Sequence, residues 1–184
     1  MKRPRDSQRK KVYVAERVAF EKLELFASRY PGGFSGDWKP LDDNSIQGTR
    51  RYVRQVIGSK RWATLVHRYD YPYENSVIKV KDGRGCTFAR GGSRGVTLPV
   101  WARSKPIVLH ELAHTLTFHE KQVGPHGWLF CRAFLDLVGT FIGADAKKEL
   151  RASFRAHKVR TSPRRVEVER LPRRIGRLAA QSRS

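Results

Sequence analysis

The feature that most constrains the fold is an apolar segment carrying two histidines and a glutamate at fixed spacing. Residues 110–114 read HELAH, and the residues around them, from 107 to 118, are apolar on most sides. A helix that is apolar around its whole circumference is normally buried. Ser104 is the expected N-cap, and Pro106 suits a first helical turn. The segment therefore predicts a buried central helix that ends near Phe118.

The spacing of the two histidines predicts a metal site. Residues four apart on a helix differ by about 40° in direction and about 6 Å in height. His110 and His114 would therefore converge on one metal ion, with Glu111 beside a metal-bound water. The alternative is a pair of core histidines with a surface glutamate. We expect His110 and His114 to be metal ligands and Glu111 to be the general base of a hydrolytic reaction.

A catalytic zinc site usually has three protein ligands and one open position. His126 follows the Gly124-Pro125 break, where the chain can double back, and it is the predicted third ligand. His119 lies nine residues after His110, which turns it to the opposite helix face. We expect His119 to be an exposed polar residue at the helix end.

Other zinc-site patterns fit this chain less well. A metzincin arrangement would place glycine at 117 and histidine at 120, where the chain has Thr117 and Glu120. A carboxylate ligand from a later helix stays open as an alternative to His126. The candidates are Glu149 and, more remotely, Asp136.

Two motifs carry a resemblance to known proteins. HELAH at 110–114 followed by HGWLF at 126–130 resembles the HExxH…HGxxF pattern of SprT-like zinc metalloproteases. The chain is more closely similar to a metallohydrolase family of actinobacteria and their phages. In that family an RDSQR-KVYxAE opening precedes a strand pair, a VLHELAH helix and an HGxxF helix. Residues 5–9 (RDSQR), 11–13 (KVY) and 15–16 (AE) match this opening, and the similarity covers about residues 3–145.

The resemblance implies an α+β, zincin-like fold in which a small antiparallel sheet packs on the HExxH helix between flanking helices. It also implies Zn²⁺ as the cofactor and a protein or peptide as the substrate. In such folds an edge strand beside the site pairs with extended substrate. Residues 95–98 directly precede the site helix, so they are expected to form this strand or an ordinary edge strand.

Hydrophobic periodicity and turn residues place the remaining elements. Residues 62–81 look extended or mixed, with a strand at 76–80. The other expected helices are 8–29, 45–57, 127–142 and a last one that Asp145 caps and that ends near 157, and the other expected strands are 86–89 and 95–99.

Positive charge dominates the composition. The chain has 38 Lys+Arg against 17 Asp+Glu, a formal net charge of +21. Both ends are basic, and residues 158–184 read as a flexible tail that follows a metallohydrolase domain at 1–157. Such a field favours anionic partners, so the termini are expected to contact nucleic acid, although a solvated tail is the alternative. SprT-like relatives include proteases that act on proteins attached to DNA.

No stretch of the sequence resembles a signal peptide or a membrane span. The expected location is the cytoplasm, or the host cytoplasm if the chain is phage-encoded, with no membrane partner. Cys86 and Cys131 are too few for a disulfide framework and are both expected in the core. The four tryptophans are expected in the core or in the wall of the site rather than as base-stacking platforms.

Three functions follow from these patterns. The first is a zinc-dependent metallopeptidase, which could work near nucleic acid. The second is a nucleic-acid-binding protein with a structural zinc, in which Glu111 would have no purpose. The third is a metallohydrolase acting on a non-peptide amide. A metallopeptidase also needs a hydrogen-bond donor that stabilises the developing oxyanion. Tyr71, Tyr73 and several arginines are candidates that the sequence does not rank.

Overall fold

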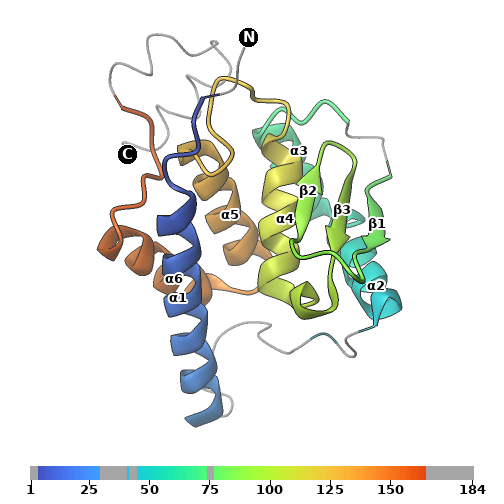
Figure 1. Cartoon of the computed structure of the whole chain (residues 1–184), viewed down its shortest axis with the longest axis horizontal. Helices are drawn as coiled ribbons and strands as arrows, with labels where there is room; N and C mark the ends of the chain where they lie inside the picture. The colour runs from blue at the N-terminus through green and yellow to red at the C-terminus, as the bar shows by residue number, and fades with distance from the viewer. Residues whose placement is uncertain (1–3, 30–40, 42–44, 74–76, 165–184) are drawn as a thin grey trace.

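The computed structural model describes residues 4–29, 41, 45–73 and 77–164 and has a mixed α+β architecture (Figure 1). No helix in these ranges is long and apolar enough to cross a membrane. The helices are α1 (Arg9–Arg29), α2 (Ile46–Ile57), α3 (Lys60–Arg68), the 3₁₀ helix η1 (Val100–Ala102), α4 (Lys105–Thr117), α5 (Trp128–Phe141) and α6 (Ala144–Ala156). The strands are β1 (Lys79–Asp82), β2 (Arg90–Gly92) and β3 (Gly95–Leu98).

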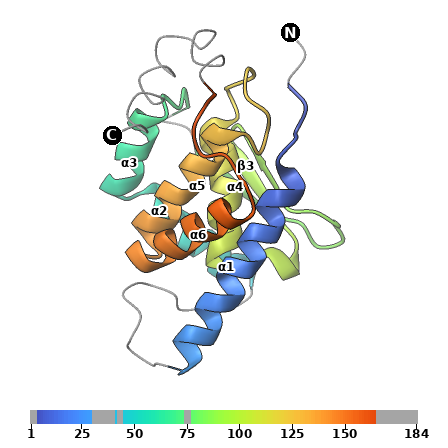
Figure 2. The same ribbon diagram turned by 90° about the vertical axis from the view of Figure 1, so that its left-hand side faces the viewer.

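The central element is α4, the helix that carries HELAH. It lies between the sheet on one side and α5 on the other, and α1 and α6 pack beyond α5 (Figures 1 and 2). Val108, Leu109, Leu112, Ala113 and Leu116 are fully buried, as expected for a helix that is apolar on all sides, whereas Ile107 is partly buried. Ser104 is its N-cap residue, and Pro106 lies in its first turn, as predicted, although the Ser104 side chain makes no capping hydrogen bond.

The first helix packs against the last one. Val12, Ala15, Ala19 and Leu23 recur at steps of three and four and are the buried residues of α1. The small alanines let α6 approach closely, and the Ser153 hydroxyl on α6 donates a hydrogen bond to the carbonyl of Ala15 at 2.7 Å. This pairing fixes the position of α1, so residues near the N-terminus reach the central helix.

The segment 62–81, predicted as extended or mixed with a strand at 76–80, contains a helix at its start and the beginning of β1 at its end. Residues 60–68 form α3, which Ser59 caps by accepting a hydrogen bond from the backbone N–H of Trp62. Trp62, Leu65 and Val66 are buried, which is a helical i, i+3, i+4 pattern. The last helix also differs in detail, because Gly143 and not Asp145 occupies its N-cap position.

The sheet is mixed rather than antiparallel, and its strand order is β1-β3-β2. The β2–β3 pair is antiparallel across a tight turn, whereas β1 pairs with β3 in parallel. The prediction that residues 95–98 form an edge strand is therefore wrong, because β3 lies in the centre of the sheet. Residues 83–89 carry the chain past β3, so the edge strand beside α4 is β2. The segment 86–89 is not a strand, and Cys86 is exposed rather than in the core.

The described chain continues past α6. Val159 is only 7% exposed and packs in the core, and the backbone N–H of Arg160 donates to the Gln8 side chain at 2.6 Å. Arg160 therefore contacts the residue that directly precedes α1. The division of the chain at residue 157 stays a prediction, since residues 165–184 lie outside the described part, as does Trp38.

Candidate metal centre

Three histidines meet at the centre of the molecule. His110 and His114 project from α4, and His126 projects from the loop that precedes α5. One ligand atom from each ring lies within 4.8 Å of the others, so the group could hold a metal ion. His110 and His126 are 4% exposed. The three residues predicted as ligands are thus brought together, close enough to hold one metal ion.

The Phe130 ring packs against all three imidazoles. Its centroid lies 4.3 Å from that of His114 and 4.9 Å from those of His110 and His126. Phe130 is on the first turn of α5 and is 1% exposed. This residue is the phenylalanine of the HGWLF motif, so the motif supplies both an imidazole and the apolar surface behind the three rings.

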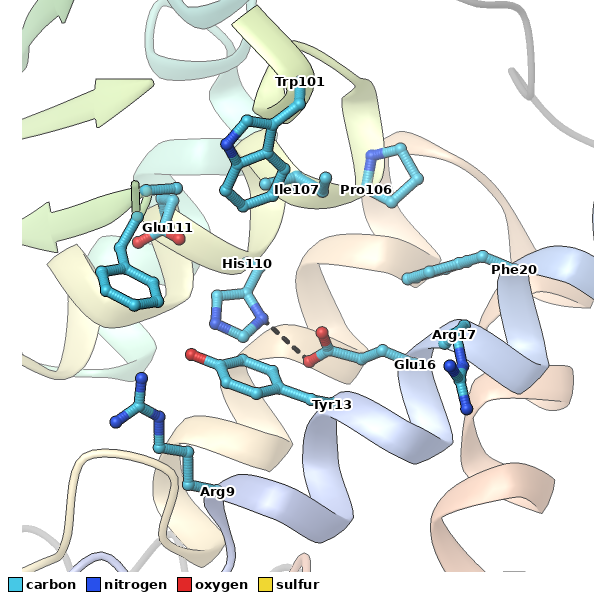
Figure 3. A pocket seen from close by; sticks show the side chains of 12 residues that line it. Arg9, Tyr13, Glu16, Arg17, Phe20, Trp101, Pro106, Ile107, His110 and Glu111 are labelled. Atoms are coloured by element: carbon cyan, nitrogen blue, oxygen red, sulfur yellow. Dashed lines mark hydrogen bonds and ion pairs between the residues drawn. The ribbon is translucent and has the colours of Figure 1, made fainter. Parts of the chain in front are cut away.

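Two carboxylates from the N-terminal region orient two of the imidazoles. The Nδ1 atom of His110 lies 2.8 Å from Oε1 of Glu16, and Nδ1 of His126 lies 2.7 Å from Oδ2 of Asp6. An ionised carboxylate only accepts, so each Nδ1 donates and each Nε2 keeps its lone pair for a ligand bond. The dashed line in Figure 3 marks the Glu16 contact.

Sequence reasoning assigned no role to Asp6 or Glu16. Both belong to the RDSQR and AE stretches that carried the resemblance, so a signal was present at these positions. Gln8, which lies between these two acidic residues in the sequence, also holds the His126 loop in position. Its side-chain amide donates to the carbonyl of His126 at 3.1 Å and ties the loop to the start of α1.

A buried nitrogen supports a metal at this position. Within the described part of the chain, Nε2 of His126 is buried and has no hydrogen-bond partner. Burial lowers the pKa of His126, with the nearby His110 as the next cause, so the neutral imidazole that binds metals is favoured. For His110, burial lowers the pKa, but the Glu16 carboxylate outweighs this effect and leaves the pKa raised. The residues present fit a divalent metal ion.

Glu111 follows His110 on α4 and lines the same cavity, with a carboxylate that is largely removed from water. Burial raises its pKa; His110 and the backbone N–H of Gly91, which donates to the carboxylate, act in the opposite direction. Its Oε2 atom is buried and has no hydrogen-bond partner among the described residues. A carboxylate with one anchored and one unengaged oxygen suits a group that exchanges a proton with a neighbouring molecule.

Strand β2 approaches α4 so closely that a side chain would not fit. A Cβ atom built on Gly91 would lie 2.7 Å from Cβ of His114 and would clash with the backbone carbonyl of Glu111. Gly91 is therefore the contact that lets the edge strand lie directly over the HELAH helix. The same approach brings its N–H to the Glu111 carboxylate.

Tyr13, in the KVY stretch that carried the resemblance, is a further residue at this site to which sequence reasoning assigned no role. Its ring centroid lies 5.1 Å from that of His126 and 5.7 Å from that of His110. Figure 3 shows its hydroxyl directed toward the same region as Arg9, whose guanidinium lies over the Tyr13 ring at 5.6 Å from its centroid. Burial raises the pKa of Tyr13, so the phenol stays protonated and can donate.

The other candidates lie elsewhere. The Tyr71 hydroxyl donates to the carbonyl of Ser93, and Tyr71 packs against Tyr73. Asp136 accepts hydrogen bonds from Arg68, Tyr69 and Lys147, and Glu149 accepts one from Lys22. Neither acid belongs to the histidine group.

His119 also stays outside the histidine group. It is not the exposed residue expected, because its side chain is 10% exposed and its Nε2 lies 3.3 Å from Oε1 of Glu120. Trp62 and Trp128 are in the core, and Trp101 is an exposed residue beside the site. Cys131 is buried, as predicted.

No protein-family model, curated protein or solved structure matches this chain. The functional argument therefore depends on the geometry of the site.

Proposed function

We propose that the protein is a zinc-dependent metallopeptidase of the HExxH type with a zincin-like active site. The observation that carries this proposal is the combination of three convergent histidines with Glu111, which lines the same cavity as His110 and whose Oε2 is buried and has no hydrogen-bond partner among the described residues. His110, His114 and His126 would hold the ion. When bound, zinc supplies Lewis-acid activation of water and of the scissile carbonyl.

The chain's own residues then perform the proton transfers. Glu111 takes a proton from the attacking water, since burial raises the pKa of its carboxyl group toward the range useful for a base. It later hands this proton to the leaving amine. The Gly91 N–H holds the carboxylate in place during both transfers.

Stabilisation of the developing oxyanion is assigned to Tyr13. Its phenol is protonated, and its ring lies under the Arg9 guanidinium and against the rings of His110 and His126. A preorganised donor of this kind stabilises charge that develops only in the transition state. Tyr71 and Tyr73 are less suitable, because the Tyr71 hydroxyl is engaged with Ser93 and neither residue lines the cavity beside His110.

The decisive experiment is Glu111→Gln in purified protein loaded with zinc. We expect the metal content to be unchanged and peptide hydrolysis to fall by about 10²–10⁴-fold, the usual contribution of a general base. Metal content is measured by mass spectrometry and hydrolysis with a quenched peptide library. Glu21→Gln, on an exposed face of α1, is the matched control. Unchanged hydrolysis in Glu111→Gln would contradict the proposal. Small non-peptide amides are tested in parallel with the peptide library. Hydrolysis of these amides without hydrolysis of any peptide would indicate the non-peptide amide hydrolase instead.

A second candidate function is nucleic-acid binding, and one feature of the sheet favours it. Residues Lys79 and Lys81 on β1 and Arg90 on β2 are exposed, and with Arg94 they line a hollow of about 660 Å³ on the sheet. The register places Lys81, Thr97 and Arg90 side by side across the three strands. The lining of this hollow contains no acidic residue.

Such a surface would contact phosphates and give strongly salt-dependent binding. The Lys79→Gln/Lys81→Gln double variant should weaken the binding of a labelled single-stranded oligonucleotide and reduce its salt dependence. Deleting residues 165–184 tests the basic tail separately and keeps Val159 and Arg160, which pack on the domain. Lys148→Gln/Arg151→Gln, on the exposed face of α6, is the control. Binding that is absent or insensitive to salt would count against a nucleic-acid partner.

A further inference from the structure

A cavity of about 450 Å³ opens beside the candidate metal centre, between α1 and the segments that precede and begin α4 (Figure 3). Ligand pockets in proteins have volumes of about 300–1,000 Å³. The apolar part of its lining comes from Phe20 on α1, from the loop before β2 and from the region 101–107. These apolar residues are Phe20, Phe88, Ala89, Trp101, Pro106 and Ile107.

Exposed aromatic rings gather at this cavity. Trp101 is 60% exposed, Phe88 is 55% exposed and Tyr13 is 44% exposed, and all three line it. Aromatic side chains carry large apolar surfaces whose burial is favourable. Exposed apolar groups that cluster in one place mark a binding site more often than isolated ones do.

The position of the cavity indicates what it binds. His110 and Glu111 form part of its wall, so whatever fills it lies directly next to the proposed reacting groups. Figure 3 shows Trp101, Ile107 and Pro106 on one side and Tyr13 and Glu16 on the other, with His110 between them. An extended peptide whose cleaved bond lies at Glu111 would therefore direct one neighbouring side chain into this space.

The charges around the cavity select against a basic side chain. Two arginines, Arg9 and Arg17, line it. The lining acids are Glu16, which is hydrogen bonded to His110, and Glu111, which is the proposed base. A lysine or arginine of the substrate would lose its hydration beside like charges. An aromatic or large aliphatic side chain would bury its own surface and that of Trp101 and Phe88.

We propose that this cavity is the specificity pocket of the enzyme, and that it takes one aromatic or large aliphatic substrate side chain adjacent to the cleaved peptide bond. This assignment of substrate class rests on the proposed peptidase function. It makes Trp101 and Phe88 specificity-determining residues and leaves the metal ligands unchanged.

The first test is a peptide library digested by the zinc-loaded full chain, with cleavage sites identified by mass spectrometry. One position next to the cleaved bond should be enriched in Phe, Tyr, Trp and Leu and depleted in Lys and Arg. Trp101→Ala should reduce the ratio of kcat/KM for Phe over Ala at this position by roughly tenfold, the lower end of the discrimination of an apolar pocket.

Two further variants sharpen this test. Ala89→Phe fills the cavity from its wall and should reduce the same ratio with the metal content unchanged. Val100→Ala is the matched control, because Val100 is 51% exposed and adjoins Trp101 in η1 but does not line the cavity. A preference that both Trp101→Ala and Ala89→Phe leave intact would overturn the assignment.

A binding measurement separates the pocket from the chemistry. Titrating metal-free protein with N-acetyl-phenylalanine amide should give a saturable change in tryptophan fluorescence that N-acetyl-lysine amide does not give. Ala89→Phe should abolish this change. Cleavage of many peptides with no preference at any position, or no fluorescence change, would overturn the assignment of the cavity as a specificity pocket. Retained binding with no hydrolysis of any peptide would contradict the peptidase function alone.

Discussion

The Nδ1 atom of His126 and the Oδ2 atom of Asp6 lie 2.7 Å apart, although 120 residues separate them in the chain. The carboxylate fixes the imidazole so that Nε2 faces the other two histidines. Partners of this kind typically contribute 10–100-fold to metal affinity. We therefore expect Asp6→Ala to weaken zinc binding by about that factor, measured by competition with a chromophoric chelator.

The control for Asp6→Ala is Glu21→Ala, which removes an acid from an exposed face of α1. Its zinc affinity should equal that of the unmodified protein, because surface charges far from an ion are screened. An equal loss in both variants would mean that the effect comes from net charge. Unchanged affinity in Asp6→Ala would contradict the orienting role of the carboxylate.

The choice of third ligand gives a second prediction. His126→Ala should lower the bound zinc to well below one ion per chain after dialysis, because two histidines on one helix do not close a site. His119→Ala should retain the metal, since His119 lies outside the histidine group. Metal content is read by mass spectrometry. Because His119 is mostly buried, a melting curve of each variant establishes that it is folded. Full zinc occupancy in His126→Ala would contradict its assignment.

The parts of the site that could be predicted from the sequence are those encoded by local spacing. His110 and His114 meet because a helix places residues four apart on one face. His126 required one more step, since the Gly124-Pro125 break lets the chain turn back. Asp6 and Glu16 were beyond such reasoning, because their partners are 120 and 94 residues away and only tertiary packing brings them together.

The arrangement of the sheet was also beyond prediction from local sequence. The strand at 95–98 was predicted correctly from its composition, but its neighbours were not. Strand order depends on how residues 83–89 cross to the far edge and on which strand fits against α4, and neither is a local property. The helix α3 was missed for another reason: Trp62 and Val66 favour strands by composition, although their spacing with Leu65 is helical.

A third prediction concerns Tyr13. Tyr13→Phe removes the hydroxyl and keeps the ring that packs on His110 and His126. We expect kcat to fall by about 10²–10³-fold, the usual cost of losing one oxyanion donor, while zinc affinity stays unchanged. Tyr73→Phe, which removes a hydroxyl away from the cavity, is the control. A KM effect with kcat unchanged would mean that Tyr13 only binds substrate.

A fourth prediction concerns stability away from the site. Burial raises the pKa of Asp136, but hydrogen bonds from Lys147, Tyr69 and Arg68 outweigh it and leave the pKa below its ordinary value. Asp136 thus contributes stability above its unfolded-state pKa of about 3.9, and this contribution is lost as the pH falls through the folded-state value. Asp136→Asn should lower the free energy of unfolding at pH 7 by about 2 kcal/mol. In urea titrations between pH 3 and pH 7, the free energy of unfolding of the variant should fall less with decreasing pH than that of the unmodified protein.

The last prediction tests the contact between the edge strand β2 and the helix α4. A Cβ atom on Gly91 would press on the backbone of Glu111 and on His114, both on α4. Gly91→Ala should therefore lower the free energy of unfolding by about 1–3 kcal/mol, the usual cost of overpacking. It should also reduce kcat, because β2 would move away and take with it the N–H that holds the Glu111 carboxylate.

Gly92→Ala is a matched control one residue away on the same strand. A Cβ atom there would meet only the Gly95 carbonyl, at an ordinary contact distance of 3.6 Å. Its stability and kcat should remain close to those of the unmodified protein. Chemical denaturation and steady-state kinetics of the two variants check both effects. Equal behaviour of Gly91→Ala and Gly92→Ala would show that β2 does not set the position of Glu111, because only the first substitution forces the strand away from α4.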